Sequence, residues 1–207
     1  MKKLKLSLLV ALLGMVSIVG AQDFTFNVKG GLNLSNVSGD VEDNKVKLGF
    51  HLGVGTDYSF APNMAIQSGL FFTSKGAKME YKEEFEGTTY KDEGTLNANF
   101  LQLPVHFAYK IDAAPETKVV LHAGPYIAYG IGGKTRLKED GDEFDKMDTF
   151  DKDYGLKRFD AGLGVGVGAE FGRILLDLGW DMGFVNLGFN EVDINSQNAY
   201  LSVGYRF

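Results

Sequence analysis

The sequence predicts an all-β fold: an eight-stranded antiparallel up-and-down transmembrane β-barrel. Three observations predict it. Apolar residues alternate with small or polar residues at period two in eight segments, which is the pattern of half-buried strands. The connections between these segments alternate between short and long. Glycine makes up 27 of the 207 residues, about 13%, whereas the usual share is ~7%.

Before the first strand, residues 1–21 form a separate segment. Three lysines lie in the first five residues, an apolar run follows, and small residues stand near the end. This pattern predicts a secretory signal peptide that is cleaved before Gln22, with an uncleaved anchor as the alternative. We therefore expect two parts, a signal peptide over 1–21 and an outer-membrane β-barrel domain over 22–207. The run is short for a transmembrane helix.

The first four predicted strands occupy 24–35, 46–60, 64–75 and 98–110. In the first two, nearly every even-numbered residue is apolar and nearly every odd-numbered residue is glycine or polar. In the third strand, four apolar residues lie on one face and polar residues or glycine lie on the other. In the fourth the odd-numbered residues from 101 to 109 are apolar, and Pro104 interrupts the ladder. We expect a bulge near Phe100 that brings Leu96 and Ala98 onto the apolar face.

The last four predicted strands occupy 118–131, 159–171, 174–185 and 199–207. Apolar residues fall on the odd numbers in three of them and on the even numbers in 174–185. The sixth strand contains GLGVGVGAEFG (162–172), in which glycine occupies almost every second position. We expect these glycines to permit tight curvature and to leave room for larger side chains from opposite strands.

The connections fix the expected topology. The segments 61–63, 112–118 and 172–173 are short, whereas those near 36–45, 76–97, 132–157 and 186–198 are long and polar. Short turns at one end and long loops at the other are typical of outer-membrane barrels. An even number of strands places both termini at the short-turn end, which would be periplasmic. A strand of ~10 residues tilted by ~45° spans ~23 Å, close to the apolar band of such barrels.

The apolar face is expected to face lipid. The interior of an eight-stranded barrel is only just wide enough for side chains, so it cannot hold so many large apolar groups. Aromatic residues gather at the short-turn ends of the strands, as a membrane-interface girdle would. The predicted periplasmic girdle consists of Phe24, Phe26, Tyr58, Phe60, Tyr109, Phe171, Tyr205 and Phe207.

These segments resemble the PorT-type outer-membrane β-barrel family, often called porin-like. The matching stretches are VKGGLNLSNVSGD (28–40), LGFHLGVGTDY (48–58), SGLFFTSKGAK (68–78), NFLQLPVHFAYK (99–110), AGPYIAYGIGGK (123–134), DAGLGVGVGAEFG (160–172) and YLSVGYRF (200–207). They follow one another over nearly the whole mature chain. The resemblance implies a barrel in the outer membrane and provides no catalytic motif. One member of the family is tied to a secretion apparatus.

Six charged residues fall in the phase of the barrel interior and are the main candidate site. We expect them to pair into a plug that closes the lumen, since charges removed from water need partners. A selectivity filter for small ions is the alternative. The six residues are Lys29, Asp57, Lys110, Glu170, Asp177 and Arg206.

The other candidate sites carry weaker signals. His51, His106 and His122 all fall in the interior phase, where they could form a metal site or an acid–base pair. No motif spacing accompanies them. We therefore expect a polar lumen without catalytic or metal-binding residues. The stretch 151–153 has part of a calcium-loop spacing, against a solvated surface loop as the simpler interpretation.

The segment 76–97 predicts a hairpin that turns at Glu86-Gly87 and extends past the membrane. Its Tyr81, Phe85 and Tyr90 are a candidate partner contact, or else the hairpin only stiffens the edge of the barrel.

The sequence thus predicts an exported, non-enzymatic protein of a Gram-negative outer membrane, without a cofactor. Its expected role is that of a surface scaffold or binding protein, or an accessory of a secretion or envelope complex; the alternative is a narrow porin-like channel. Expected partners are outer-membrane lipid, the barrel-assembly machinery through the terminal YLSVGYRF, and an envelope or secretion-complex protein at the extracellular loops.

The composition excludes other classes of partner. Without the signal peptide the chain has 18 basic and 27 acidic residues, a net charge of −9, which disfavours binding to nucleic acid. The chain has no cysteine, which excludes disulfides and thiolate metal sites.

Overall fold

The computed structural model describes residues 24–40, 44–85, 88–139, 142–152, 155–188 and 192–207, with the side chains of 80–92, 139 and 142–144 left out. The predicted signal peptide, 1–21, lies outside the described residues. Ten strands are assigned: β1 (Phe24–Gly39), β2 (Asn44–Ala61), β3 (Met64–Phe85), β4 (Thr88–Ala114), β5 (Thr117–Gly132), β6 (Lys134–Glu139), β7 (Asp142–Asp148), β8 (Phe159–Phe171), β9 (Ile174–Gly183) and β10 (Ile194–Arg206).

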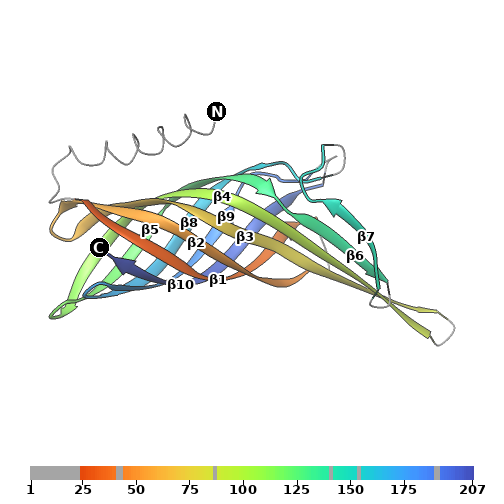
Figure 1. Cartoon of the computed structure of the whole chain (residues 1–207), viewed down its shortest axis with the longest axis horizontal. Coiled ribbons are helices and arrows are strands. Elements are labelled where there is room, and N and C mark those ends of the chain that lie inside the picture. The colour runs from red at the N-terminus through yellow and green to blue at the C-terminus, as the bar shows by residue number, and fades with distance from the viewer. Residues whose placement is uncertain (1–23, 41–43, 86–87, 140–141, 153–154, 189–191) are drawn as a thin grey trace, which may run out of the picture.

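Eight of these strands close into a barrel, in the order β1–β2–β3–β4–β5–β8–β9–β10, and every pairing is antiparallel (Figure 1). Strands β1 and β10 complete the ring, with Lys29 opposite Gly204 and Leu32 opposite Leu201. The turns at 62–63, 115–116 and 172–173 lie at one end, together with the start of β1 and the C-terminus. The predicted eight-stranded up-and-down barrel is therefore confirmed.

Beyond the barrel, β3 and β4 continue as a paired hairpin to Phe85 and Thr88, as predicted; the predicted turn residues 86–87 lie outside the described residues. The segment 132–157, expected to be a loop, instead contains two strands. Strand β6 pairs with β4 and β7 pairs with β6, so β3, β4, β6 and β7 form a small sheet at the loop end. β6 and β7 lack apolar alternation because they pack on no barrel core. Ladder hydrogen bonds hold β6 to the part of β4 that extends beyond the barrel, and hold β7 to β6.

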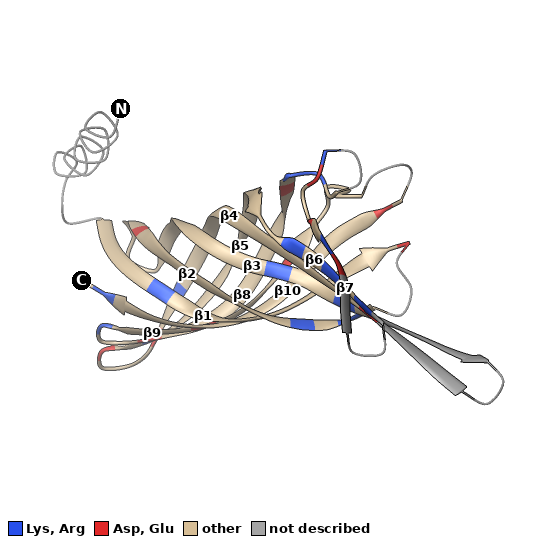
Figure 2. Ribbon diagram, turned by 45° about the vertical axis from the view of Figure 1, so that its right-hand side comes forward, with Lys and Arg blue, Asp and Glu red and all other residues tan. Residues whose placement is uncertain are grey.

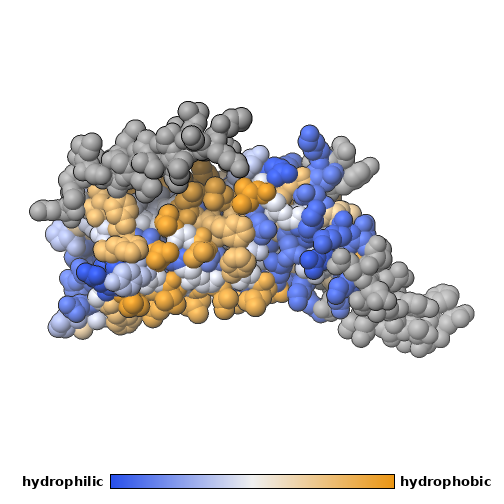
Figure 3. Space-filling view, in the orientation of Figure 1, coloured by the Kyte–Doolittle hydropathy of each residue, from blue (hydrophilic) through white to orange (hydrophobic). Residues whose placement is uncertain are grey.

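Alternation sorts the side chains of the barrel onto two faces. The outer face is apolar, with Leu48, Leu52 and Leu178 each more than half exposed, and Figure 3 shows it as an orange belt between hydrophilic ends. The inner face is polar, and Asn33 and Asp160 are fully buried there. The fold therefore places apolar groups outside and hydrogen-bonding groups inside, the reverse of a water-soluble barrel.

The glycines of β8 make room inside the barrel. A Cβ on Gly164 would lie 2.7 Å from Nε2 of His106, and one on Gly166 would lie 2.5 Å from the ring of His122. His122 lies on the neighbouring strand β5, directly opposite Gly166. The space is thus used by rings from β5 and β4, the first and second strands on one side of β8, rather than from opposite strands as expected.

A register shift at Asn99 and Phe100 between β4 and β5 confirms the expected bulge, but its consequence differs. Leu96 and Ala98 do not join the outer face. They are buried inside with Phe100, because β4 keeps one phase against β3 and its even-numbered residues point inward throughout. These residues belong to two apolar clusters that fill the loop end of the barrel.

Candidate functional site

The lumen near the short turns contains a chain of ion pairs drawn from four strands. Lys110 on β4 contacts Asp57 on β2 at 2.8 Å and Glu170 on β8 at 2.7 Å. Arg206 on β10 contacts the other oxygen of Glu170 at 2.6 Å. Gln67 donates to Asp57 at 2.9 Å. Lys110, Asp57 and Glu170 are buried and the Arg206 side chain is 27% exposed, so this network fills the end of the barrel interior and reaches its rim at Arg206.

The second ion-pair group lies further along the lumen. Lys29 contacts Asp177 at 3.2 Å, and Nε2 of His122 contacts the other oxygen of that carboxylate at 2.8 Å. The Nδ1 atoms of His122 and His106 are 3.0 Å apart, and the rings stack at 5.1 Å. One of these two nitrogens must donate and the other must accept, so the pair shares one proton at this contact.

The third histidine is held separately. Nδ1 of His51 lies 2.7 Å from the amide oxygen of Asn33, and its Nε2 contacts the hydroxyl of Ser202. All three predicted histidines therefore lie inside the barrel, and each contacts other lumen side chains.

A polar cavity of about 80 Å³ lies between these groups. By the usual volume of one probe sphere per water, ~10–15 Å³, it has room for several waters. Gln102 donates to Asp181 at 2.9 Å on its wall. The described part of the chain contains no group of three or more histidine or acidic residues arranged to hold a metal ion. The cavity is lined by Asn27, Lys29, Asn33, His51, Gly55, Asp57, Gln67, Ser68, Phe71, Thr73, Gln102, Pro104, His106, His122, Asp177, Asp181, Asn198, Tyr200 and Ser202.

A third ionic group, not predicted as a site, lies nearer the loops. Nζ of Lys75 lies 3.6 Å from Asp160 and 4.6 Å from the centre of the Tyr126 ring. Asp160 also accepts from Ser196 at 2.8 Å and from Tyr126 at 3.2 Å. The strand phase contained the signal, because Asp160 falls on the same even-numbered face as the interior glycines of β8.

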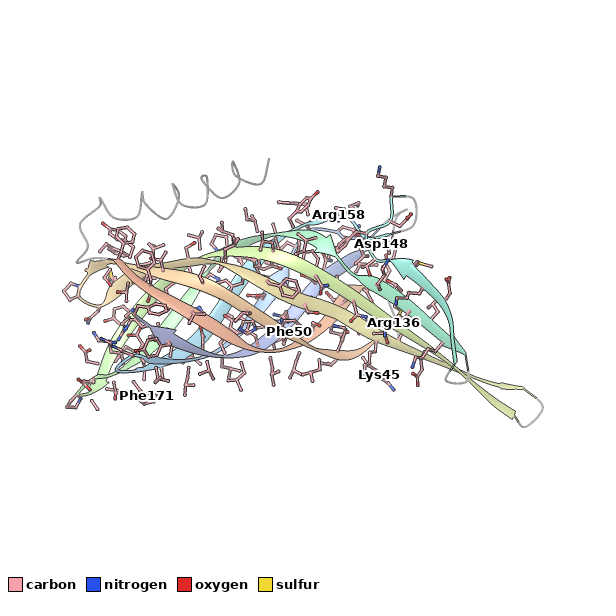
Figure 4. All side chains as sticks on the ribbon, viewed as in Figure 1. Lys45, Phe50, Arg136, Asp148, Arg158 and Phe171 are labelled. Atoms are coloured by element: carbon pink, nitrogen blue, oxygen red, sulfur yellow. The ribbon has the colours of Figure 1, made fainter. Side chains whose placement is uncertain are left out.

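An apolar cap covers this group at the loop end. Phe150, from the segment after β7, packs edge-on against Phe100 with 5.5 Å between ring centres. It lies against Gly130, where a Cβ would collide with its ring. Arg158 fastens the segment by donating to the carbonyl of Gly130 at 2.8 Å and by stacking on Phe150 at 5.1 Å. Figure 4 shows Arg158 and Asp148 together at this end.

The aromatic residues of the predicted girdle lie near the short turns. Phe24 contacts Tyr58 at 4.8 Å between ring centres, and Tyr205 contacts Phe207 at 5.6 Å. The more exposed members range from 38% for Tyr58 to 73% for Phe207. Figure 4 places Phe171 at this end, away from the loops. Phe26, Phe60, Tyr109 and Phe171 are likewise exposed on the outer face.

Two other predicted sites are only partly placed. The backbone of the long hairpin sets Tyr81 opposite Asp92 and Tyr90 opposite Glu83, and it sets Phe85 at the end of β3. The side chains of these three aromatic residues lie outside the described residues. The candidate calcium stretch also extends beyond them, at Asp153.

Comparison with known proteins gives a family match. A family model described as an outer membrane protein beta-barrel domain matches residues 20–188. No curated protein sequence matches the chain significantly. Among the described residues, no helix is long and apolar enough to cross a membrane.

Solved structures with a similar fold include three bacterial outer-membrane proteins. The attachment invasion locus protein Ail of Yersinia pestis is 15% identical, with 90% of this chain and 100% of that chain covered and a TM-score of 0.44. Neisserial surface protein A is 14% identical, with coverages of 88% and 97% and a TM-score of 0.44. A major outer membrane protein of Thermus thermophilus is 16% identical, with coverages of 89% and 99% and a TM-score of 0.48.

Proposed function

Because the chain belongs to the outer membrane protein beta-barrel domain family, which indicates an outer-membrane location, we propose that it is a non-enzymatic surface scaffold or binding protein. The observation that carries the proposal is that both ends of the lumen are occupied by side chains. Lys110 and its two carboxylates occupy one end, and Phe150 packs over the other. Binding is therefore assigned to the parts outside the barrel, chiefly the sheet of β3, β4, β6 and β7.

The histidines support the non-enzymatic part of the proposal. His51 contacts Asn33 and Ser202, and His122 contacts Asp177 and His106. Each ring is thereby held in a polar network, with no serine–histidine–carboxylate arrangement among the described contacts. We assign these rings a structural role in filling and hydrogen-bonding the lumen.

The PorT-type resemblance supports a more specific version, in which the protein is an accessory of a secretion or envelope complex. In this version the hairpin residues Tyr81, Phe85 and Tyr90 contact the partner. The same proposal includes three further points. The chain is exported through a signal peptide cleaved before Gln22, it is inserted by barrel-assembly machinery, and its aromatic girdle lies at the periplasmic interface.

The deciding experiment compares the surface and secreted proteomes of a strain lacking the gene with those of its parent. The accessory role predicts that a defined set of cargo proteins disappears and that plasmid-borne wild type restores it. A variant lacking only 80–91, the outer part of the hairpin, should insert into the membrane and fail to restore the set. An unchanged proteome would contradict the accessory role and leave the scaffold role.

The polar cavity of about 80 Å³ favours one alternative, a narrow channel for small ions or solutes. Recordings of the purified protein in planar bilayers separate the two. The occupied ends of the lumen predict no steady conductance for wild type, because three buried charged groups block one end. Steady conductance that changes ion selectivity in an Asp57→Asn variant would support the channel instead.

A further inference from the structure

Asp181 on β9 is a buried carboxylate that has no counterion of its own. It lies on the inner face of the barrel, 3% exposed, and takes part in none of the ion pairs that the described residues form. The cation that acts on it is Lys75 on β3, a strand on which Figure 2 shows basic residues, but Lys75 pairs with Asp160 at 3.6 Å. One ammonium group is therefore shared by two buried carboxylates. A buried charge without a partner is costly, so a further positive charge would stabilise this part of the lumen.

The amides that contact Asp181 have unused acceptors. Gln102 on β4 reaches across the lumen and donates to Asp181 at 2.9 Å, and Asn198, directly opposite on β10, donates to it as well. A carboxylate only accepts hydrogen bonds, so both amides must present their NH₂ groups to it. The amide oxygens of Gln102 and Asn198 are buried and contact no donor among the described residues.

The hydrogen bonds of the two stacked histidines decide which nitrogen of His106 carries a proton. Nε2 of His122 lies 2.8 Å from a carboxylate oxygen of Asp177, which can only accept, so this nitrogen donates. In neutral rings Nδ1 of His122 then accepts from Nδ1 of His106 at 3.0 Å. Nε2 of His106 is therefore left as an acceptor, and it is buried without a partner in the described part of the chain.

Gly164 on β8 lies directly opposite Asp181 and beside His106. A Cβ at this position would lie 2.7 Å from Nε2 of His106 and 2.8 Å from Oδ1 of Asp181, so any larger residue would displace these groups. The imidazole nitrogen and the carboxylate consequently border one common space.

These groups line the polar cavity of about 80 Å³ and together define what it can bind. The two amide oxygens and the imidazole nitrogen accept hydrogen bonds, and the carboxylate carries an uncompensated negative charge. An anion offers no positive charge, and neither does water. The matching ligand is a cation with several N–H donors, because hard metal cations favour oxygen ligands over an imidazole nitrogen.

We propose that this cavity binds the ammonium group of a small primary amine. The group brings one positive charge to Asp181 and three N–H donors to the acceptors of Gln102, Asn198 and His106. His106 thus has a binding role in addition to its structural one. The inference goes beyond the proposed scaffold function and does not depend on it.

The rest of the cavity limits the size of the amine. At ~10–15 Å³ per atom-sized sphere, the volume admits only a few non-hydrogen atoms. The rings of Phe71 and Tyr200 line the same cavity, and aromatic faces attract cations. Because side chains occupy both ends of the lumen, the barrel is best tested by folding it with the amine present.

The test measures reversible urea unfolding of the full mature protein in vesicles of zwitterionic lipid, followed by the fluorescence of its single tryptophan, Trp180. We expect about 100 mM methylammonium chloride to lower the equilibrium constant of unfolding about tenfold, as a site with a dissociation constant of about 10 mM would. Tetramethylammonium chloride at the same concentration has the same charge and no N–H group, so it should leave the constant unchanged.

Two variants locate the effect. Asp181→Asn keeps the shape of the side chain and removes its charge. Without amine it should be at least as stable as wild type, and its response to methylammonium should disappear. Glu170→Gln is the matched control, because it also removes a buried carboxylate charge, but one that contacts Lys110 and Arg206. It should be less stable than wild type and keep the tenfold response.

Nuclear magnetic resonance of wild type in uncharged micelles gives a second measurement that requires no variant. Methylammonium should shift the Nε2 signal of His106 and leave the ring nitrogens of His51, which already contact Asn33 and Ser202, as they are. Three outcomes would overturn the proposal. Wild type that does not respond to methylammonium would mean that a proton neutralises Asp181. Equal stabilisation by tetramethylammonium would show a general effect of salt, and equal stabilisation by potassium chloride would assign the cavity to metal cations.

Discussion

Lys110 contacts two carboxylates at once in the part of the lumen nearest the short turns. Asp57 and Glu170 come from strands far apart in the sequence and would repel each other without it. The ammonium group therefore holds β2, β4 and β8 together from inside. Such a buried pair stabilises the fold only while both partners are present, because removing one partner leaves the other charge buried and uncompensated.

Replacing Lys110 with methionine should destabilise the folded barrel by about 3–5 kcal/mol, because two buried carboxylates lose their cation. The measurement is urea unfolding of the barrel in lipid vesicles, followed by tryptophan fluorescence. Lys118→Met is the control at the same end, since Lys118 and Asp112 form an exposed pair that contributes under about 1 kcal/mol. Equal loss in both variants would mean that the interior network adds no stability.

The sequence was sufficient to predict which face of a strand each residue occupies, but not which residues contact one another. Period-two alternation assigns Asp57, Lys110 and Glu170 to one face without any structure. Which of them meet depends on how the strands stagger around the ring, and no local pattern contains that information. Lys75 and Asp160 were missed as a pair for the same reason, although both stand in the interior phase.

The segment after β7 is the element that closes the loop end. Phe150 fills the space over Gly130, and Thr149 donates to the carbonyl of Asn97 at 2.7 Å. Leu156 and Leu187 pack in the same cluster. The cap is therefore a folded apolar element that rests on the barrel wall.

A Phe150→Ala variant should loosen this cap while leaving the barrel intact. A buried phenylalanine truncated to alanine loses about 3–5 kcal/mol of packing. We expect faster amide hydrogen exchange over 149–158 and unchanged exchange in β8 and β9, measured by mass spectrometry. Met147→Ala, whose side chain is 38% exposed, should leave the exchange of 149–158 as it is in wild type. Unchanged exchange in the Phe150 variant would show that other contacts hold the cap.

The elements differ in how far sequence could predict them. The eight barrel strands were predictable because each separates an apolar face from a polar one. Strand β10 begins at Ile194, earlier than the predicted 199, because its first residues are polar and carry no alternation. Strands β6 and β7 were missed because neither shows apolar alternation, and because β6 is held by pairing with β4, which the segment 132–157 does not contain.

At the scale of the whole molecule, the barrel has two unlike ends. One has three two-residue turns and the C-terminus, and the other has the long hairpin, β6, β7 and the cap. The hydrophilic ends flank one apolar belt (Figure 3). From this polarity we predict that the long elements lie at the cell surface and the short turns in the periplasm.

Cysteine labelling tests this orientation, because the chain has no cysteine of its own. Lys146→Cys, on β7, should react with a membrane-impermeant maleimide on intact cells. Asp112→Cys, near a short turn, should react only after the outer membrane is permeabilised. Mass spectrometry of the purified protein gives the labelled fraction, and the reverse pattern would show that the barrel is inserted the other way round.

The contact between β1 and β10 also governs the order in which the molecule can form. This seam joins residues separated by almost the entire chain, so bringing them together carries the largest loop-closure entropy of any strand pair. The seven other ring pairings join strands that follow one another around the barrel and close shorter loops, so we expect the seam to form last. Until then two unpaired strand margins remain open to neighbouring chains. The seam is therefore the expected slow step of assembly, and the point at which truncated chains would aggregate.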